Sequence, residues 1–131
     1  MEIPKGKTRP EIQACEKVIK DFYAEWIAKN PSKTVWNSSL NAFIKVKYLS
    51  INETYEHAAR SYESTLAVLR LTEVLEKARV VSVGPPKSDD KNQKSFSRIT
   101  VLKFGMIRLV VGFQKSTEEY VQYCITSGSK K

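Results

Sequence analysis

Apolar residues in the first third of the chain recur at steps of three and four. They mark one face of the segment from about Glu11 to Lys29, and charged residues occupy the opposite face. This spacing predicts an amphipathic helix, because residues three and four apart lie on the same side of a helix. Asn30-Pro31 ends the helix, since proline cannot continue it. The apolar positions are Ile12, Cys15, Ile19, Phe22 and Trp26.

The segments on either side of this helix follow different patterns. Residues 1–10 are polar and are interrupted by two prolines, so we expect a flexible arm. Residues 43–49 alternate between apolar and polar side chains. A period of two predicts a strand with one buried side, on which Ile44, Val46 and Tyr48 would lie.

Two helices are predicted between this strand and the middle of the chain. Ser50 and Glu53 have the spacing of a capping box, in which a hydroxyl and a carboxylate satisfy free amides, and this opens a helix at about 51–61. A second helix follows at about 64–77. Its candidate buried residues are Leu66, Leu69, Val74, Leu75 and Ala78.

The pattern becomes that of strands after Ala78. Residues 79–83, 96–104, 106–113 and 120–126 are rich in β-branched and aromatic side chains, and a long polar loop at 84–95 separates the first two. Neighbouring strands with short turns favour an antiparallel meander.

We therefore predict one α+β domain at residues 11–127. It is helical at 11–78 with one early strand, and it forms a β-meander at 79–127. The N-terminal helices pack on one face of a curled, about four-stranded antiparallel sheet.

Composition indicates in which cellular compartment such a domain is expected. The chain has 131 residues, of which 41% are apolar, which suits one hydrophobic core. No run reaches the ~18 apolar residues of a membrane span, and the first residues do not resemble a secretory signal. Cys15 and Cys124 each fall in an apolar pattern, so we expect buried, inert thiols. These features favour a reduced, cytoplasmic protein without a membrane partner.

Positive charge is concentrated in the second half of the chain. Residues 1–76 hold 11 Lys/Arg and 10 Asp/Glu, a net charge of +1, whereas residues 77–131 hold 11 and 4, a net charge of +7. Such an asymmetry favours a polyanionic partner, and RNA is the one we expect. Lysines scattered for solubility would give the same total.

The chain has one histidine, His57. On the predicted helix it shares a face with Glu53 and Arg60. An imidazole titrates near neutrality and can move protons, while a guanidinium fork matches phosphate oxygens. The alternative is that Glu53 only caps the helix and His57 only faces solvent.

Basic residues alternate with apolar ones along the predicted strands. One sheet face bearing these cations would suit a phosphate backbone, although polar sheet exteriors also occur in proteins that bind nothing. On the last strand, alternation places Tyr120, Gln122, Cys124 and Thr126 on one side. The residues expected to contact RNA are Arg98, Lys103, Arg108, Lys115, Gln122 and Thr126, with Lys94 in the loop before them.

Several kinds of chemistry lack a signal in the sequence. The five glycines are isolated, so no phosphate-cradling loop is formed, and one histidine with Asp89-Asp90 does not build a typical metal site. We expect neither a metal nor another cofactor.

Short motifs in the C-terminal two-thirds are similar to those of a known superfamily. They are Glu56-His57-Ala58-Ala59-Arg60, Ser64-Thr65-Leu66, Leu75-Glu76-Lys77-Ala78 and the closing strands. Over residues 50–127 the chain resembles the barnase–EndoU–colicin–RelE-like ribonucleases. In particular, it resembles those attached to large polyvalent proteins of phages and conjugative elements.

The resemblance implies metal-independent, toxin-like cleavage of RNA. By position, His57 would be the general acid/base, Arg60 and Lys94 or Arg98 would stabilise charge, and Gln122 and Thr126 would orient the substrate. Besides RNA, the partners considered are an inhibitor and a neighbouring-domain protein, and the sequence alone does not reveal whether a cognate inhibitor exists. The chain departs from better-known members in lacking a second histidine and an acid on the sheet. A non-catalytic nucleic-acid-binding module therefore remains an alternative.

A third alternative is a protein-interaction domain. In this hypothesis Trp26, Trp36 and the polar loop form a surface for a partner protein.

Overall fold

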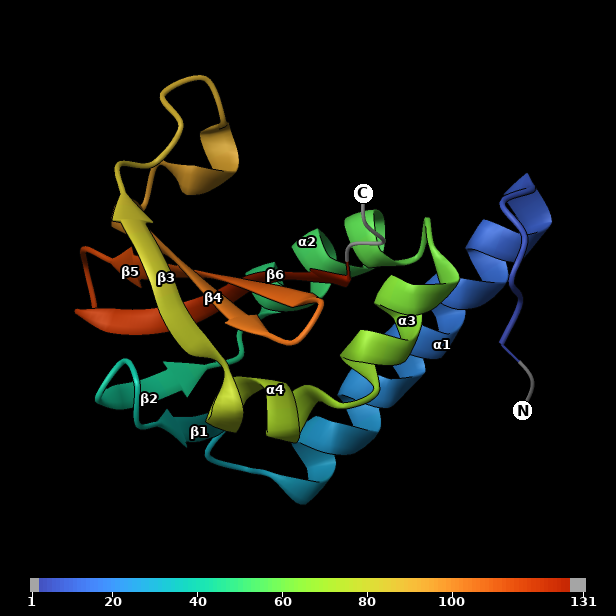
Figure 1. Cartoon of the computed structure of the whole chain (residues 1–131), viewed down its shortest axis with the longest axis horizontal. Helices are drawn as coiled ribbons and strands as arrows, with labels where there is room; N and C mark the ends of the chain where they lie inside the picture. The colour runs from blue at the N-terminus through green and yellow to red at the C-terminus, as the bar shows by residue number, and fades with distance from the viewer. Residues whose placement is uncertain (1–2, 128–131) are drawn as a thin grey trace.

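Four α-helices and a six-stranded sheet share one core in the computed structural model, which describes residues 3–127 except for the side chain of Asn92 (Figure 1). The elements in chain order are α1 (Arg9–Lys29), β1 (Thr34–Asn37), β2 (Ala42–Lys45), α2 (Tyr48–Ala58), α3 (Tyr62–Val68), α4 (Leu71–Lys77), β3 (Arg79–Gly84), the 3-10 turn η1 (Lys91–Gln93), β4 (Phe96–Phe104), β5 (Ile107–Gln114) and β6 (Glu119–Ser127).

The sheet is curled into a half-barrel and its strands are mixed. Their order is β1-β2-β6-β5-β4-β3, and every pair is antiparallel except β2 with β6. The α+β class is confirmed, but the prediction of about four antiparallel strands is wrong. The strand predicted at 43–49 corresponds to β2, but its hairpin partner β1 was not predicted, because it has only four residues. Its parallel join to β6 spans two residue pairs, too few to leave a sequence pattern.

The strand predicted at 43–49 ends early. Its buried residues Ile44 and Val46 are confirmed, but the chain is already helical at Tyr48, whose side chain is 78% exposed. The Ser50 hydroxyl accepts a hydrogen bond from the Lys47 amide at 2.9 Å, so Ser50 lies inside the first turn of α2. Glu53 therefore lies beyond the helix start, and the predicted capping box is wrong.

The helix predicted at 64–77 is two helices. The break falls at Arg70, whose backbone leaves the helical region with φ −105° and ψ 31°. Restarting the helix there turns Leu71 into the core beside Val74 and Leu75, while Leu66 is left exposed.

The other predicted elements are confirmed within about two residues. α1 begins at Arg9, where the Thr8 hydroxyl accepts a hydrogen bond from the Glu11 amide at 3.4 Å. This arrangement satisfies one of the free amides of the first turn. The strands predicted at 79–83, 96–104, 106–113 and 120–126 are β3 to β6.

A bulge in β6 interrupts the expected alternation. Val110 and Val111 of β5 lie opposite Cys124 and Gln122, so Tyr123 is the extra residue between them. Gln122 therefore faces α1, whereas Tyr123 and Cys124 both face the other side of the sheet. There they form a second cluster, made of Phe96, Val110, Val121, Tyr123 and Cys124.

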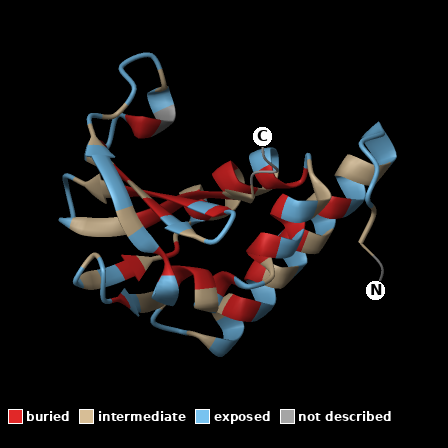
Figure 2. Cartoon of the chain, viewed as in Figure 1, coloured by how far each residue is buried: buried red, intermediate tan, exposed pale blue. Residues whose placement is uncertain are grey.

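The main core lies between the helices and the sheet, where the buried residues concentrate in Figure 2. Gln122 is fully buried in it. Its Oε1 accepts a hydrogen bond from the Tyr23 hydroxyl at 2.7 Å, and its Nε2 donates to the Thr54 hydroxyl at 2.7 Å. These bonds correct the expectation that Gln122 contacts RNA, because the bulge turns it away from the open face.

Both cysteines are buried and unpaired, as predicted. Trp26 is also buried, and its indole N–H donates to the Thr72 hydroxyl at 2.8 Å. Trp26 is therefore not part of an exposed partner surface, contrary to the third alternative. None of the helices within residues 3–127 is long and apolar enough to cross a membrane.

We predict that Tyr23→Phe lowers the free energy of unfolding by about 1–3 kcal/mol. Removing the hydroxyl leaves the buried Gln122 carbonyl without its donor, and an unsatisfied buried polar group costs roughly that amount. The measurement is urea unfolding followed by circular dichroism. Tyr48→Phe is the matched control, because its ring is exposed; an equal loss in both variants would contradict the proposed role of the bond.

Candidate functional site

A pocket of about 310 Å³ opens where α2, β6 and the loop between β3 and β4 meet. It lies on the side of the sheet that carries the second cluster. The pocket gathers one imidazole, one phenol and two cations. The chemically active side chains on its wall are His57, Lys87, Asp90, Arg108, Tyr123 and Thr126.

His57 enters this pocket from the last turn of α2. Its side chain is 55% exposed, and its Nε2 lies 3.7 Å from Oε1 of Glu53, one helical turn earlier. The Glu53 side chain is only 6% exposed, so the carboxylate stands behind the imidazole on the protein side. The carboxylate therefore lies close to the imidazole, and much of the ring is accessible to a ligand.

Tyr123 lies on the pocket side of β6 together with Cys124, because the bulge places these two neighbouring residues on the same face. Its hydroxyl donates a hydrogen bond to Oδ2 of Asp90 at 3.1 Å. Burial raises the pKa of Tyr123 well above its usual value, and the neighbouring Glu53 and Asp90 carboxylates raise it further. Tyr123 is therefore a neutral phenol at physiological pH and acts as a hydrogen-bond donor.

Polar contacts anchor the long loop over the pocket. Gln93 is buried, and its Oε1 accepts a hydrogen bond from the Lys87 amide at 2.8 Å. Together with the bond from Tyr123 to Asp90, this contact holds Lys87 on the pocket wall. Figure 1 shows the loop projecting beyond the end of the sheet. The sequence offered no apolar anchor here, and the structure replaces it with amide and carboxylate contacts.

Arg108 and Thr126 complete the opposite wall. They lie directly opposite each other on β5 and β6, so their side chains share a face. Arg108 is exposed, and no carboxylate among the described residues forms an ion pair with it. The structure thus brings His57, Arg108 and Thr126 together in one pocket.

Arg60 and Lys94 do not join them. Arg60 lines a separate cavity with Lys7, Arg9 and Glu16, and its Nε donates to the Glu56 carbonyl at 3.0 Å. Lys94 is exposed in the loop just after η1, outside the pocket wall.

Arg98 and Lys115 lie toward the opposite end of the sheet. The Arg98 guanidinium lies 4.0 Å from the centre of the Phe113 ring, and one of its N–H groups donates to the Tyr120 hydroxyl at 2.7 Å. Arg98 therefore has protein partners for its charge and needs no ligand. It lies on the side of the sheet that packs against the main core. Lys115 is exposed in the turn that follows β5.

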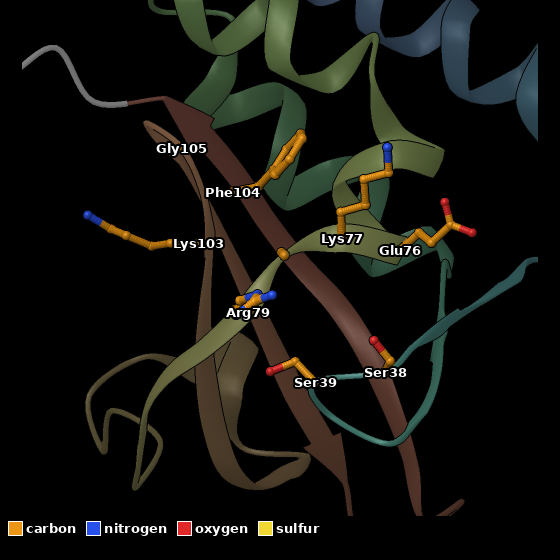
Figure 3. A pocket seen from close by; sticks show the side chains of 9 residues that line it. Ser38, Ser39, Glu76, Lys77, Arg79, Lys103, Phe104 and Gly105 are labelled. Atoms are coloured by element: carbon orange, nitrogen blue, oxygen red, sulfur yellow. The ribbon is translucent and has the colours of Figure 1, made fainter.

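Lys103 borders a larger hollow of about 770 Å³ near the start of β3. Figure 3 shows its side chain extending away from Phe104, Lys77 and Glu76. Arg79 lines it as well, but neither an imidazole nor a phenol does, so the hollow lacks the groups that lie together beside His57.

The structure gives no sign of a metal centre in the part of the chain it describes. Within residues 3–127, no three histidine, cysteine, aspartate or glutamate side chains gather as metal ligands would.

Two residues at the site were not predicted for it. Glu53 was predicted to share a helix face with His57, with helix capping as the alternative. Lys87 lies in the long polar loop and Tyr123 on the last predicted strand, but the fold of the loop and the bulge in β6 decide where their side chains lie, and neither feature follows from the sequence.

We predict that Cys124 resists alkylation in the native protein. Burial raises its pKa to about 12, and the Glu53 carboxylate adds to the shift. Since only the thiolate reacts, roughly one molecule in 10⁴ is reactive at pH 8. Peptide mapping after iodoacetamide treatment should find Cys124 unmodified unless guanidinium is present. Rapid modification of the folded protein would contradict the assignment.

A family model described as large polyvalent protein-associated domain 3 matches residues 14–105, from within α1 to the end of β4. No curated protein and no solved structure matches significantly. The match supports the predicted association with large polyvalent proteins and carries no statement about nuclease activity. Because it covers well over half of the 131 residues, the chain belongs to the large polyvalent protein-associated domain 3 family.

Proposed function

We propose that this chain is an RNA-directed, metal-independent ribonuclease-like domain of a mobile element, of the toxin or effector type. The observation that carries the proposal is the pocket in which His57, backed by Glu53, faces Lys87, Arg108 and Tyr123. It combines a proton acceptor, two cations and a neutral donor in about 310 Å³.

RNA supplies its own nucleophile, so these groups suffice for cleavage. His57 accepts the proton of a 2′-hydroxyl, and the 2′ oxygen attacks the adjacent phosphorus. The bond from phosphorus to the 5′ oxygen breaks, and the leaving oxygen takes a proton from water in the open pocket. The products are a 2′,3′-cyclic phosphate and a 5′-hydroxyl. The Glu53 carboxylate at 3.7 Å stabilises the positive charge that the imidazole acquires.

The remaining groups stabilise the charge that develops on phosphorus. Lys87 and Arg108 approach from the loop and from β5, and a guanidinium can hold two phosphate oxygens at once. Tyr123 remains protonated and can donate to a third oxygen. With a single histidine and a water as the acid, the proposed reaction is slower than one served by two histidines.

A non-catalytic nucleic-acid-binding module is the second candidate. The observation in its favour is the exposure of His57, because a catalytic base works best when it is held rigidly. A protein-interaction module has one observation in its favour as well. Trp36 and Phe43 stack edge to face at 5.1 Å on the exposed side of the β1–β2 hairpin.

The first test is incubation of the purified chain with mixed RNA in EDTA between about pH 5 and 8. We expect cleavage that leaves cyclic phosphate ends. His57→Ala should reduce the rate by about 10²–10⁴-fold, as loss of a general base does. Arg60→Ala is the matched control and should retain activity, because Arg60 lines a different cavity.

Two outcomes would count against the ribonuclease. Absence of cleavage throughout this pH range would leave a binding module. Cleavage of a substrate with a 2′-deoxyribose at the scissile position would exclude the internal nucleophile.

A further inference from the structure

Three cations lie directly opposite one another on neighbouring strands. Arg79 of β3 is opposite Lys103 of β4, and Lys103 is opposite Arg108 of β5. Directly opposite residues of antiparallel strands share a face, with Cβ atoms about 5 Å apart. All three residues are exposed. We call them the cation row.

The cation row leads to the proposed active site. Its last member, Arg108, is opposite Thr126 of β6, and both line the pocket that contains His57. Neighbouring strands are about 4.8 Å apart, so the row extends roughly 10 Å across the sheet before it meets the pocket.

This arrangement is unfavourable in the free protein. Like charges directly opposite on adjacent strands repel each other, and none of the three has a carboxylate partner within residues 3–127. Elsewhere in the protein, lysines near the sheet have their charge balanced by a carboxylate. The ammonium groups of Lys45 and Lys47 lie 3.5 and 2.9 Å from the carboxylate oxygens of Glu119. The uncompensated row is therefore matched to an anion that the chain does not supply.

We propose that the cation row is the track on which a single-stranded RNA backbone crosses β3, β4 and β5 into the His57 pocket. The inference rests on the proposed function and identifies its substrate as a single strand held through its phosphates. The row consists of three cations, and contacts to phosphates carry no sequence information, so we expect binding that is independent of base sequence.

The shape of the pocket favours a single strand over a duplex. The row lies on the open sheet, but its end is flanked by α2 and by the loop that carries Lys87. A phosphate must leave the sheet surface and enter a hollow of about 310 Å³ to reach His57. A flexible single strand can bend into this hollow. The phosphates of a rigid A-form duplex are fixed on the outer surface of the duplex and cannot enter it.

The experiment measures binding without cleavage. The His57→Ala protein is titrated against a fluorescently labelled 12-nucleotide RNA at ~50 to 200 mM salt. Each phosphate contact on a single strand contributes about 0.7 to the slope of log affinity against log salt. Lys103→Gln should reduce that slope by about 0.7. Lys17→Gln, which removes the same charge from the exposed surface of α1, should leave it unchanged.

Lys103→Glu gives effects of opposite sign on stability and binding. It places a carboxylate between Arg79 and Arg108, so repulsion becomes attraction, and the melting temperature of the free protein should rise by about 2–5 °C. Its affinity for the labelled strand should fall by about tenfold or more. A substitution that only damages the fold would lower both the melting temperature and the affinity.

Duplex RNA of the same length should bind at least about tenfold more weakly, and single-stranded DNA should bind within a few-fold, because the row contacts phosphates. Equal binding of the duplex, or equal loss of affinity in Lys17→Gln, would overturn the track. His57-dependent cleavage that persists with an unchanged salt slope in Lys103→Gln would overturn the track and leave the ribonuclease intact. If the salt slope depends on Lys103 but the unsubstituted protein does not cleave RNA, the track would stand and the proposed ribonuclease would be overturned.

Discussion

The buried amide of Gln122 is the constraint on which the rest of the structure depends. An amide in an apolar core is unfavourable unless its donor and acceptor are both satisfied, and here Tyr23 of α1 and Thr54 of α2 satisfy one each. The two bonds hold two helices against the central part of β6. The bulge that follows at Tyr123 then turns the next residues to the opposite side of the sheet. The phenol of the pocket thus lies beside the amide that organises the core.

The short parallel pair between β2 and β6 decides where His57 lies. Ile44 and Lys45 pair with Tyr120 and Val121, after which the chain leaves the sheet and α2 packs against β6. Lys47 holds this crossing, because it forms an ion pair with Glu119 and lowers the pKa of that carboxyl. The last turn of α2 then arrives beside Thr126. A longer β2 would occupy that edge and displace the helix.

The sequence predicts elements whose pattern is local and long. α1 and the strands β3 to β6 follow from periodicity and turn residues, and their bounds agree within about two residues. Strand β1 and the break at Arg70 could not be predicted, because a four-residue strand and a helix restart are decided by packing against distant segments.

The candidate site was likewise only partly predictable from the sequence. His57, Arg108 and Thr126 were found by residue type, and they meet in one pocket. Gln122 and Tyr123 were placed on the wrong sides of β6, since a bulge reverses alternation and leaves no compositional mark.

The structure also separates the basic residues behind the net charge of +7 in residues 77–131 into those that already have a contact and those that could bind an anion. Arg98 stacks on aromatic rings and Lys115 lies in a distant turn, so neither explains an anion site. A charged residue on the edge strand β3 can prevent strand-to-strand aggregation, which would account for Arg79 alone. It does not account for Lys103 and Arg108, which lie on interior strands where repulsion is not needed for that purpose. Protection of an edge strand therefore does not account for the whole row, whereas the ligand that we propose to cross the strands would contact all three residues.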